Sequence, residues 1–208
     1  MMIFILITGG AGNVGGSLAE RLVKNPDYFV VILDNLTTGS IHKLPPANYS
    51  NWKFINGDVN CYDDISAVMT SFHFDYVFHL AAAVGVFNIV KNPIESMVTN
   101  IRGTENVLEA AHSTKTPVFL TSSSEVYGKN ISNSLRESDD RILGTPVTLR
   151  WSYSEAKAID ESLAYAYFTE KQLETRIVRF FNTVGPRQLG AYGMVVPRFV
   201  ESALEGKP

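Results

Sequence analysis

A tyrosine and a lysine four residues apart, Tyr153 and Lys157, are the side chains in this sequence best suited to acid–base chemistry. At a spacing of i and i+4 the two share one face of a helix. A free tyrosine has a pKa of about 10, but a neighbouring ammonium stabilises the phenolate, which can then take a proton from a hydroxyl at neutral pH. The same spacing occurs by chance in ordinary amphipathic helices, so the pair needs support from the rest of the chain.

Three serines and a glutamate follow the apolar run Pro117–Thr121. In a doubly wound sheet, ligands lie beyond the carboxyl ends of the strands, where a hydroxyl from Ser122–Ser124 can bond the substrate oxygen being oxidised. Three serines in a row also form an ordinary turn. Glu125 comes next and is a candidate second acid or base.

The segment Thr8–Gly15 is rich in glycine and directly follows the apolar run Ile3–Ile7. Its glycines fit a G-x-G-x-x-G pattern in one register, from Gly10, and G-x-x-G-x-x-G in another, from Gly9. Such a turn lets the backbone approach a pyrophosphate, which the N-terminus of the next helix then binds. The alternative is a simple glycine-rich turn. The preceding strand and the following helix favour dinucleotide binding.

Two aspartates, one at the end of the second apolar run and one shortly after the third, could contact the adenosine half of a dinucleotide. Asp34 follows Gly15 by about 20 residues, the spacing of a ribose-binding carboxylate. A carboxylate there repels a 2′-phosphate, and the next arginine in the chain is only Arg102, so NAD is favoured over NADP. Asp34 could instead form a turn with Asn35. Asp58 could bond the adenine amino group or cap the following helix.

These residues need a scaffold of alternating strands and helices, and the hydrophobic pattern supplies one. Segments with helical spacing separate most of the apolar runs, which indicates a doubly wound α/β Rossmann fold with a parallel sheet. The expected strands are Ile3–Ile7, Phe29–Leu33, Trp52–Ile55, Tyr76–Leu80, Pro117–Thr121 and Thr175–Phe180. A polar loop is expected at Lys129–Thr145 and a last helix at Val195–Gly206.

The sequence predicts one complete domain and the beginning of a second. Residues 1–181 are predicted to form an NAD-binding Rossmann domain that carries the catalytic residues. Residues 182–208 are predicted to begin a substrate-binding region. No strand closes the chain after the last helix, so we expect a truncated sequence whose C-terminal substrate domain is largely missing.

Composition limits the other functions. The 208 residues are 45% hydrophobic and 19% charged, with a net charge of −3 that does not predict nucleic-acid binding. One cysteine, Cys61, cannot form an intrachain disulfide or a cysteine metal cluster. The apolar run Met1–Ile7 is too short to cross a bilayer. We therefore expect a cytoplasmic protein without a membrane or metal partner, in which His79 is structural.

Several of these motifs together resemble the extended short-chain dehydrogenase/reductase family, in its branch of nucleotide-sugar epimerases, dehydratases and decarboxylases. The resemblance covers essentially the whole chain. The matching stretches are Thr8–Gly15, Asp34–Leu36 with Gly39, Gly57–Val59, His79–Ala82, Thr99–Thr104, Ser123–Gly128, Tyr153–Lys157 and Arg179–Arg187.

The resemblance implies tightly bound NAD, oxidation of a nucleotide sugar at C4 and later return of the hydride. It implies catalytic roles for Ser123, Tyr153 and Lys157, with Glu125 assisting. The implied cofactor-binding residues are Gly9, Gly12, Asn13, Val14, Gly15, Asp34, Asn35, Gly39, Asp58, Val59, Leu80, Ala81, Ala82, Asn100, Thr121, Tyr153, Lys157 and Phe180. The implied substrate-binding residues are Ser123, Ser124, Asn182, Arg187, Val195 and Pro197, with Gly193–Phe199 packing on the nucleotide base. A homodimer is expected to form through helices at Asn92–His112 and Trp151–Lys171.

Within this branch, two features predict different reactions. Dehydratases typically have an aspartate where this chain has Ser124, so 4,6-dehydration is disfavoured. The order Ser123-Ser124-Glu125 is similar to UDP-glucuronate decarboxylases, whereas the segments Phe180–Arg187 and Tyr192–Pro197 are more similar to epimerases. We expect a UDP-sugar 4-epimerase, with a UDP-glucuronate decarboxylase as the alternative. A non-catalytic NAD-binding protein is a third hypothesis, disfavoured by the intact Ser123, Tyr153 and Lys157.

Overall fold

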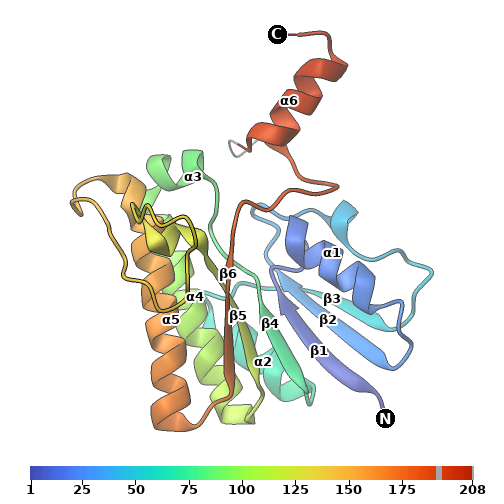
Figure 1. The fold of residues 1–208 in the computed structure, drawn as a ribbon. Coiled ribbons are helices and arrows are strands. Elements are labelled where there is room, and N and C mark those ends of the chain that lie inside the picture. Colours follow the sequence, from blue (N-terminus) through green and yellow to red (C-terminus); the bar gives the residue numbers. More distant parts are fainter. Residues whose placement is uncertain (191–193, 208) are drawn as a thin grey trace.

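Six short strands form one parallel sheet, as the computed structural model shows (Figure 1). The structure describes residues 1–190 and 194–207, without the side chains of residues 86–88. The strands are β1 (Ile3–Thr8), β2 (Tyr28–Asp34), β3 (Trp52–Asn56), β4 (Tyr76–His79), β5 (Val118–Ser123) and β6 (Thr175–Phe180). Their order is β3-β2-β1-β4-β5-β6, the doubly wound arrangement of a dinucleotide-binding fold. The predicted fold class is therefore confirmed.

Helices connect these strands, and their bounds agree with the sequence pattern. They are α1 (Asn13–Leu22), α2 (Tyr62–Ser71), α3 (Val86–Lys91), α4 (Pro93–Thr114), α5 (Ser152–Lys171) and α6 (Val195–Leu204). In the described residues, the 3₁₀ turns η1 (Ile41–Lys43), η2 (Ser124–Tyr127) and η3 (Leu149–Trp151) accompany them. The short α3 was not predicted from the sequence. The sequence predicted that all three serines follow the strand, but β5 continues past Thr121. Ser122 and Ser123 therefore belong to the strand.

Two hydrophobic layers hold the sheet, one on each face. Because side chains alternate along a strand, Ile5 and Ile7 of β1 point to the layer that contains Ala19 of α1. Leu6 points to the opposite layer, which α2, α4 and α5 cover and which includes Leu108. All five side chains are buried. The two layers fix the carboxyl ends of all the strands at one edge of the sheet.

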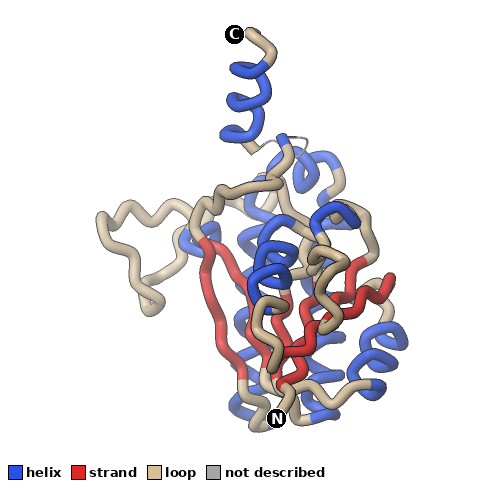
Figure 2. Tube along the Cα trace, turned by 90° about the vertical axis from the view of Figure 1, so that its right-hand side faces the viewer, coloured by secondary structure: helices blue, strands red, loops and turns tan. Residues whose placement is uncertain are grey.

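Helix α6 lies apart from this body in two perpendicular views (Figures 1 and 2). None of its residues is buried, and Phe199 is 70% exposed. It follows the stretch that leaves β6 at the carboxyl edge of the sheet. Within the described part of the chain, none of the helices combines the length and the apolar character needed to span a membrane.

Candidate active site

A cavity of about 860 Å³ lies at the carboxyl ends of the strands. Most of the residues predicted to bind cofactor or substrate line it: Gly9, Gly12, Asn13, Val14, Gly15, Asp34, Asn35, Asp58, Val59, Leu80, Ala81, Ala82, Thr121, Ser123, Tyr153, Lys157, Phe180, Asn182, Val195 and Pro197. Gly39, Asn100, Ser124, Glu125 and Arg187 are not among its lining residues. Gly193, part of the segment expected on the nucleotide base, lies outside the described residues.

The glycine loop forms the floor of the cavity between β1 and α1. Gly9 has a φ of 71°, and a Cβ there would lie 2.5 Å from the backbone nitrogen of Ala81. A Cβ on Gly15 would overlap the carbonyl oxygen of Gly9. Helix α1 then begins at Asn13 with no acidic residue in its first turn. No side chain of the glycines and no negative charge therefore blocks a pyrophosphate from the N-terminus of α1, so the loop fits a dinucleotide.

Asp34 lies at the end of β2 and is mostly buried. One carboxylate oxygen accepts a hydrogen bond from the backbone N–H of Ala11 at 2.9 Å, and the other accepts one from Leu36 at 2.8 Å. A Cβ on Gly39 would lie 2.7 Å from this carboxylate, so the glycine leaves room for Asp34 and does not itself line the cavity. The remaining lone pairs of the carboxylate are free to accept ribose hydroxyls.

The sequence left Asp58 as an adenine-binding residue or as the cap of the next helix, and the second interpretation is wrong, because α2 is capped at Cys61 without a side-chain hydrogen bond. Asp58 lines the cavity. It also accepts hydrogen bonds from the backbone and side-chain nitrogens of Asn60, at 2.8 and 2.9 Å, and one from the Asn35 amide at 3.2 Å. Its own backbone N–H donates to Asp64 in the first turn of α2. Asp58 therefore organises the turn after β3 and faces the cavity at the same time.

Lys157 is almost completely buried on α5, and two of its three hydrogens have fixed partners. The ammonium donates to the carbonyl oxygen of Thr121 at 3.1 Å and to a carboxylate oxygen of Asp160 at 3.0 Å. Lys157 is 2% exposed and Asp160 is fully buried. The hydrogen bond to Thr121 ties α5 to β5, and the ion pair within α5 holds the ammonium beside Tyr153.

Tyr153 lies in a largely desolvated position, and burial raises the pKa of its phenol above the usual range. Two neighbours oppose this effect: the positive charge of Lys157 and a hydrogen bond with the Ser123 side chain. The negative charges of Asp160 and Glu125 add to the increase. The structure therefore brings Ser123, Tyr153 and Lys157 together, with Glu125 close enough to influence the phenol.

The three consecutive serines have different environments because two of them belong to a strand. Ser122 donates its hydroxyl proton to Glu161 at 2.5 Å, and Arg179 binds the same carboxylate through two nitrogens, at 2.9 and 2.8 Å. Ser123 has its side chain on the other face of the strand. Its hydroxyl accepts the backbone N–H of Glu125 at 3.2 Å. Ser124 begins the turn η2.

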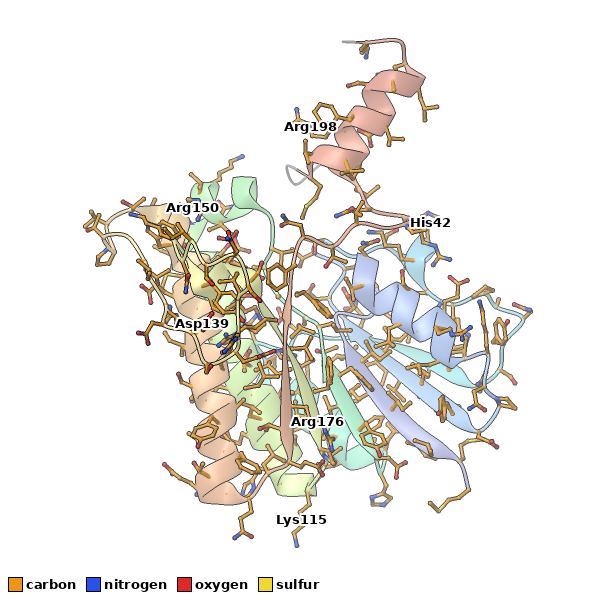
Figure 3. All side chains as sticks on the ribbon, viewed as in Figure 1. His42, Lys115, Asp139, Arg150, Arg176 and Arg198 are labelled. Atoms are coloured by element: carbon orange, nitrogen blue, oxygen red, sulfur yellow. The ribbon has the colours of Figure 1, made fainter. Side chains whose placement is uncertain are left out.

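Glu125 forms an ion pair with Arg150, at 3.2 Å between the carboxylate and the guanidinium. Both side chains are exposed, and the guanidinium lies 4.6 Å from the centre of the Trp151 ring, which is buried. Arg150, labelled in Figure 3, therefore stacks on the residue that immediately precedes α5. Sequence reasoning did not identify this pair.

His79 ends β4 and is buried between two threonines. Its Nδ1 is 2.7 Å from the hydroxyl of Thr8, and its Nε2 is 3.2 Å from the hydroxyl of Thr104. Burial, assisted by the charge of Lys157, lowers the pKa of the imidazole to about 3. The neutral ring links β1, β4 and α4. Within the described residues, no group of His, Cys, Asp and Glu side chains could hold a metal ion.

Two predicted residues act on the backbone around the cavity. The Asn100 amide accepts the backbone N–H of Ala83 at 2.8 Å and donates to its carbonyl at 3.2 Å, which fixes the loop after β4. Arg187 donates to the carbonyl oxygen of Lys43 and forms an ion pair with Glu20 of α1. Lining residues that the sequence did not point to include Thr37, Thr38, Lys43, Glu95 and Gln188.

Known proteins similar to this chain include NAD-dependent enzymes, in agreement with the dinucleotide-binding geometry of the cavity. The model of the NAD dependent epimerase/dehydratase family matches residues 5–208. A UDP-N-acetyl-alpha-D-glucosaminuronate decarboxylase from Bacillus cytotoxicus is 41% identical over 202 residues, covering 97% of this chain and 61% of the relative. UDP-glucuronic acid decarboxylase 6 from Arabidopsis thaliana is 34% identical, covering 98% and 57%.

Solved structures of 4-epimerases are also similar. The UDP-glucose 4-epimerase of Thermus thermophilus in complex with NAD has a TM-score of 0.88 at 27% identity, covering 99% of this chain and 64% of the epimerase. The UDP-N-acetylglucosamine 4-epimerase of Methanobrevibacter ruminantium has a TM-score of 0.88 at 29% identity, covering 100% and 64%. The chain thus spans about three fifths of the length of these relatives.

Proposed function

The chain belongs to the NAD-dependent epimerase/dehydratase family, and from this premise we propose that it is the cofactor-binding and catalytic part of an NAD-dependent UDP-uronate decarboxylase. Its cofactor is NAD. The observation that carries the choice of reaction is a second carboxylate beside the catalytic group: Glu125 lies in η2 directly after β5, and its backbone N–H donates to the Ser123 hydroxyl at 3.2 Å. Its negative charge also acts on the Tyr153 phenol. An epimerase needs only one acid–base group at the reacting hydroxyl, whereas decarboxylation also requires protonation of a carbon.

The first step uses residues that the fold has already brought together. Bound NAD supplies the acceptor, and later the donor, of the hydride at sugar C4. The Tyr153 phenolate takes the proton of the C4 hydroxyl, and the buried ammonium of Lys157 stabilises the phenolate. The Ser123 hydroxyl, beside Tyr153, orients the same sugar oxygen. The Lys157–Asp160 pair keeps the ammonium in place without contacting the sugar.

The second step breaks the bond between C5 and the carboxylate carbon. The C4 ketone accepts the electron pair of that bond as carbon dioxide leaves, and in this proposal Glu125 provides the proton that C5 then takes. Arg150, ion-paired with Glu125, gives the neighbourhood a cation that can meet the sugar carboxylate. Without such a cation, Glu125 would repel a uronate.

A 4-epimerase is the second candidate. Its support is the similarity to solved 4-epimerases and the segment Phe180–Arg187. The relative at 41% identity is a decarboxylase, however, and this outweighs the epimerase that the sequence analysis placed first. Under either reaction, we propose that Asn182, Val195 and Pro197, which line the cavity, hold the nucleotide.

Product analysis separates these functions. The protein expressed from its complete gene is incubated with UDP-glucuronate, UDP-N-acetylglucosaminuronate, UDP-glucose and UDP-galactose, and the products are read by mass spectrometry and sugar chromatography. We expect a uronate to lose the mass of carbon dioxide, and Glu125→Gln to lose this activity while still binding NAD. Interconversion of the two hexoses with intact uronates would instead establish the epimerase. NAD binding without turnover of any sugar would indicate a non-catalytic protein.

A further inference from the structure

Lys43 is a buried lysine whose ammonium has no close partner. The residue is 8% exposed and lines the cofactor cavity. Within the described part of the chain, its ammonium makes no hydrogen bond and no ion pair within 4.0 Å. A lysine is rarely buried to this extent unless it is paired, because desolvating a charge is costly. An anionic ligand in the cavity would offset that cost.

The position of Lys43 is fixed by its backbone. The turn η1 packs against α1 at Gly16, where a Cβ would lie 2.5 Å from the Lys43 carbonyl oxygen. The side chain of Ser40 caps the turn, and the backbone N–H of Ser40 bonds the carbonyl of Ala11 in the glycine loop at 3.0 Å. Arg187 also donates to the Lys43 carbonyl. Figure 3 shows His42, the preceding residue of the same turn, near the segment that leaves β6.

Asp34 is the acidic residue whose negative charge acts on Lys43, but its carboxylate is oriented by other partners. Both carboxylate oxygens accept backbone N–H groups, from Ala11 and Leu36. Burial lowers the pKa of Lys43, and the negative charge of Asp34 opposes that effect. The first turn of α1 carries no acid. Lys43 therefore places a positive charge where the glycine loop and Asp34 meet, at the adenosine end of the cavity.

We propose that Lys43 is an anion-binding residue of the cofactor site, which contacts a phosphate on the adenosine half of the dinucleotide. Two phosphates share this chemistry: the pyrophosphate of NAD and the 2′-phosphate of NADP. The sequence disfavoured the 2′-phosphate of NADP because no arginine follows Asp34 closely. The fold, however, brings Lys43 close to Asp34. This inference depends on the cofactor and is independent of the sugar reaction.

Binding of NAD, NADP and adenosine to the cofactor-free protein, measured by isothermal titration calorimetry, tests the proposal. Lys43→Met keeps the apolar stem and removes the charge, Lys43→Arg restores the charge, and Lys24→Met is the control because Lys24 is an exposed lysine near the end of α1. We expect Lys43→Met to weaken dinucleotide binding by about tenfold or more, since a hydrogen bond to a charged group is lost. Salt should then weaken binding less steeply than in the wild type.

The pattern of loss identifies the phosphate. Equal weakening of NAD and NADP, with adenosine unchanged, supports contact with the pyrophosphate, and weakening of NADP alone supports contact with the 2′-phosphate. Lys43→Arg should bind close to wild type in both cases. Wild-type affinity for both dinucleotides in Lys43→Met, or the same loss in Lys24→Met or with adenosine, would overturn the proposal. Because no sugar is turned over, failure of the decarboxylase assay leaves this result unaffected.

Discussion

Acidification should destabilise the protein through one residue, His79. The ring is 1% exposed, between the hydroxyls of Thr8 and Thr104, and its pKa in the folded state is about 3. In the unfolded chain the pKa returns to about 6.5. Between these values the unfolded state binds a proton that the folded state does not bind. Stability is therefore lost as the pH falls from about 6.5 toward 3.

The two pKa values set the size of this effect. A pH of 5 lies about 1.5 units below the pKa of histidine in the unfolded chain, so the free energy of unfolding is about 2 kcal/mol lower than at neutral pH. By pH 3 the loss approaches about 4 to 5 kcal/mol, a large share of the total stability of an ordinary domain. Burial is the main cause of the shift, and the charge of Lys157 adds to it.

Urea unfolding at pH 7.5 and pH 5, followed by circular dichroism, measures this effect in the wild type and in His79→Gln. The variant loses stability at both pH values because its hydrogen bonds change, but it should lack the additional loss of about 2 kcal/mol on acidification. His73→Gln is the control, since His73 is exposed, and it should follow the wild type. If the wild type and His79→Gln lose the same free energy between the two pH values, the reasoning about His79 is wrong.

Three further substitutions have defined outcomes. Tyr153→Phe should bind NAD normally in calorimetry but lose about 10²- to 10⁴-fold in kcat, because the proton acceptor is removed; retained turnover would exclude this role for Tyr153. Asp160→Asn leaves the Lys157 charge buried without its partner, so the free energy of unfolding in urea should fall by about 3 to 5 kcal/mol. Glu170→Gln, at an exposed position of the same helix, is the control, and similar stabilities of the two variants would contradict the assigned ion pair. Gly9→Ala forces a side chain toward the Ala81 backbone at a positive φ, and should abolish NAD binding in calorimetry; wild-type affinity would show that the loop can adjust.

Local patterns were sufficient to predict the scaffold and its main chemical groups. The strand and helix periods placed the Thr8–Gly15 loop at the first strand-to-helix turn and Asp34 at the end of the next strand, and the i, i+4 spacing placed Tyr153 and Lys157 on one helix face. In each of these cases neighbours in the sequence determine the arrangement. The structure has them at one edge of the sheet, as the doubly wound fold requires.

Contacts between distant segments were not accessible in the same way. Lys43 reaches the cavity because η1 folds back on α1, and Arg150 meets Glu125 across 25 residues of chain. The two threonines that enclose His79 come from β1 and α4. The serines were expected after the strand, but β5 includes Ser122 and Ser123, and so their side chains face opposite ways. Pairing with β6 extends the strand by these residues.

The fate of the hydrogen at sugar C4 tests the proposed reaction most directly. UDP-glucuronate carrying deuterium at C4 is incubated with the protein from its complete gene, and the product is weighed by mass spectrometry. We predict a UDP-pentose that has lost carbon dioxide and retained the deuterium, because the hydrogen leaves C4 and returns to it within one catalytic cycle. A product that keeps its carboxylate, or a pentose in which the deuterium has been replaced by solvent hydrogen, would contradict the account.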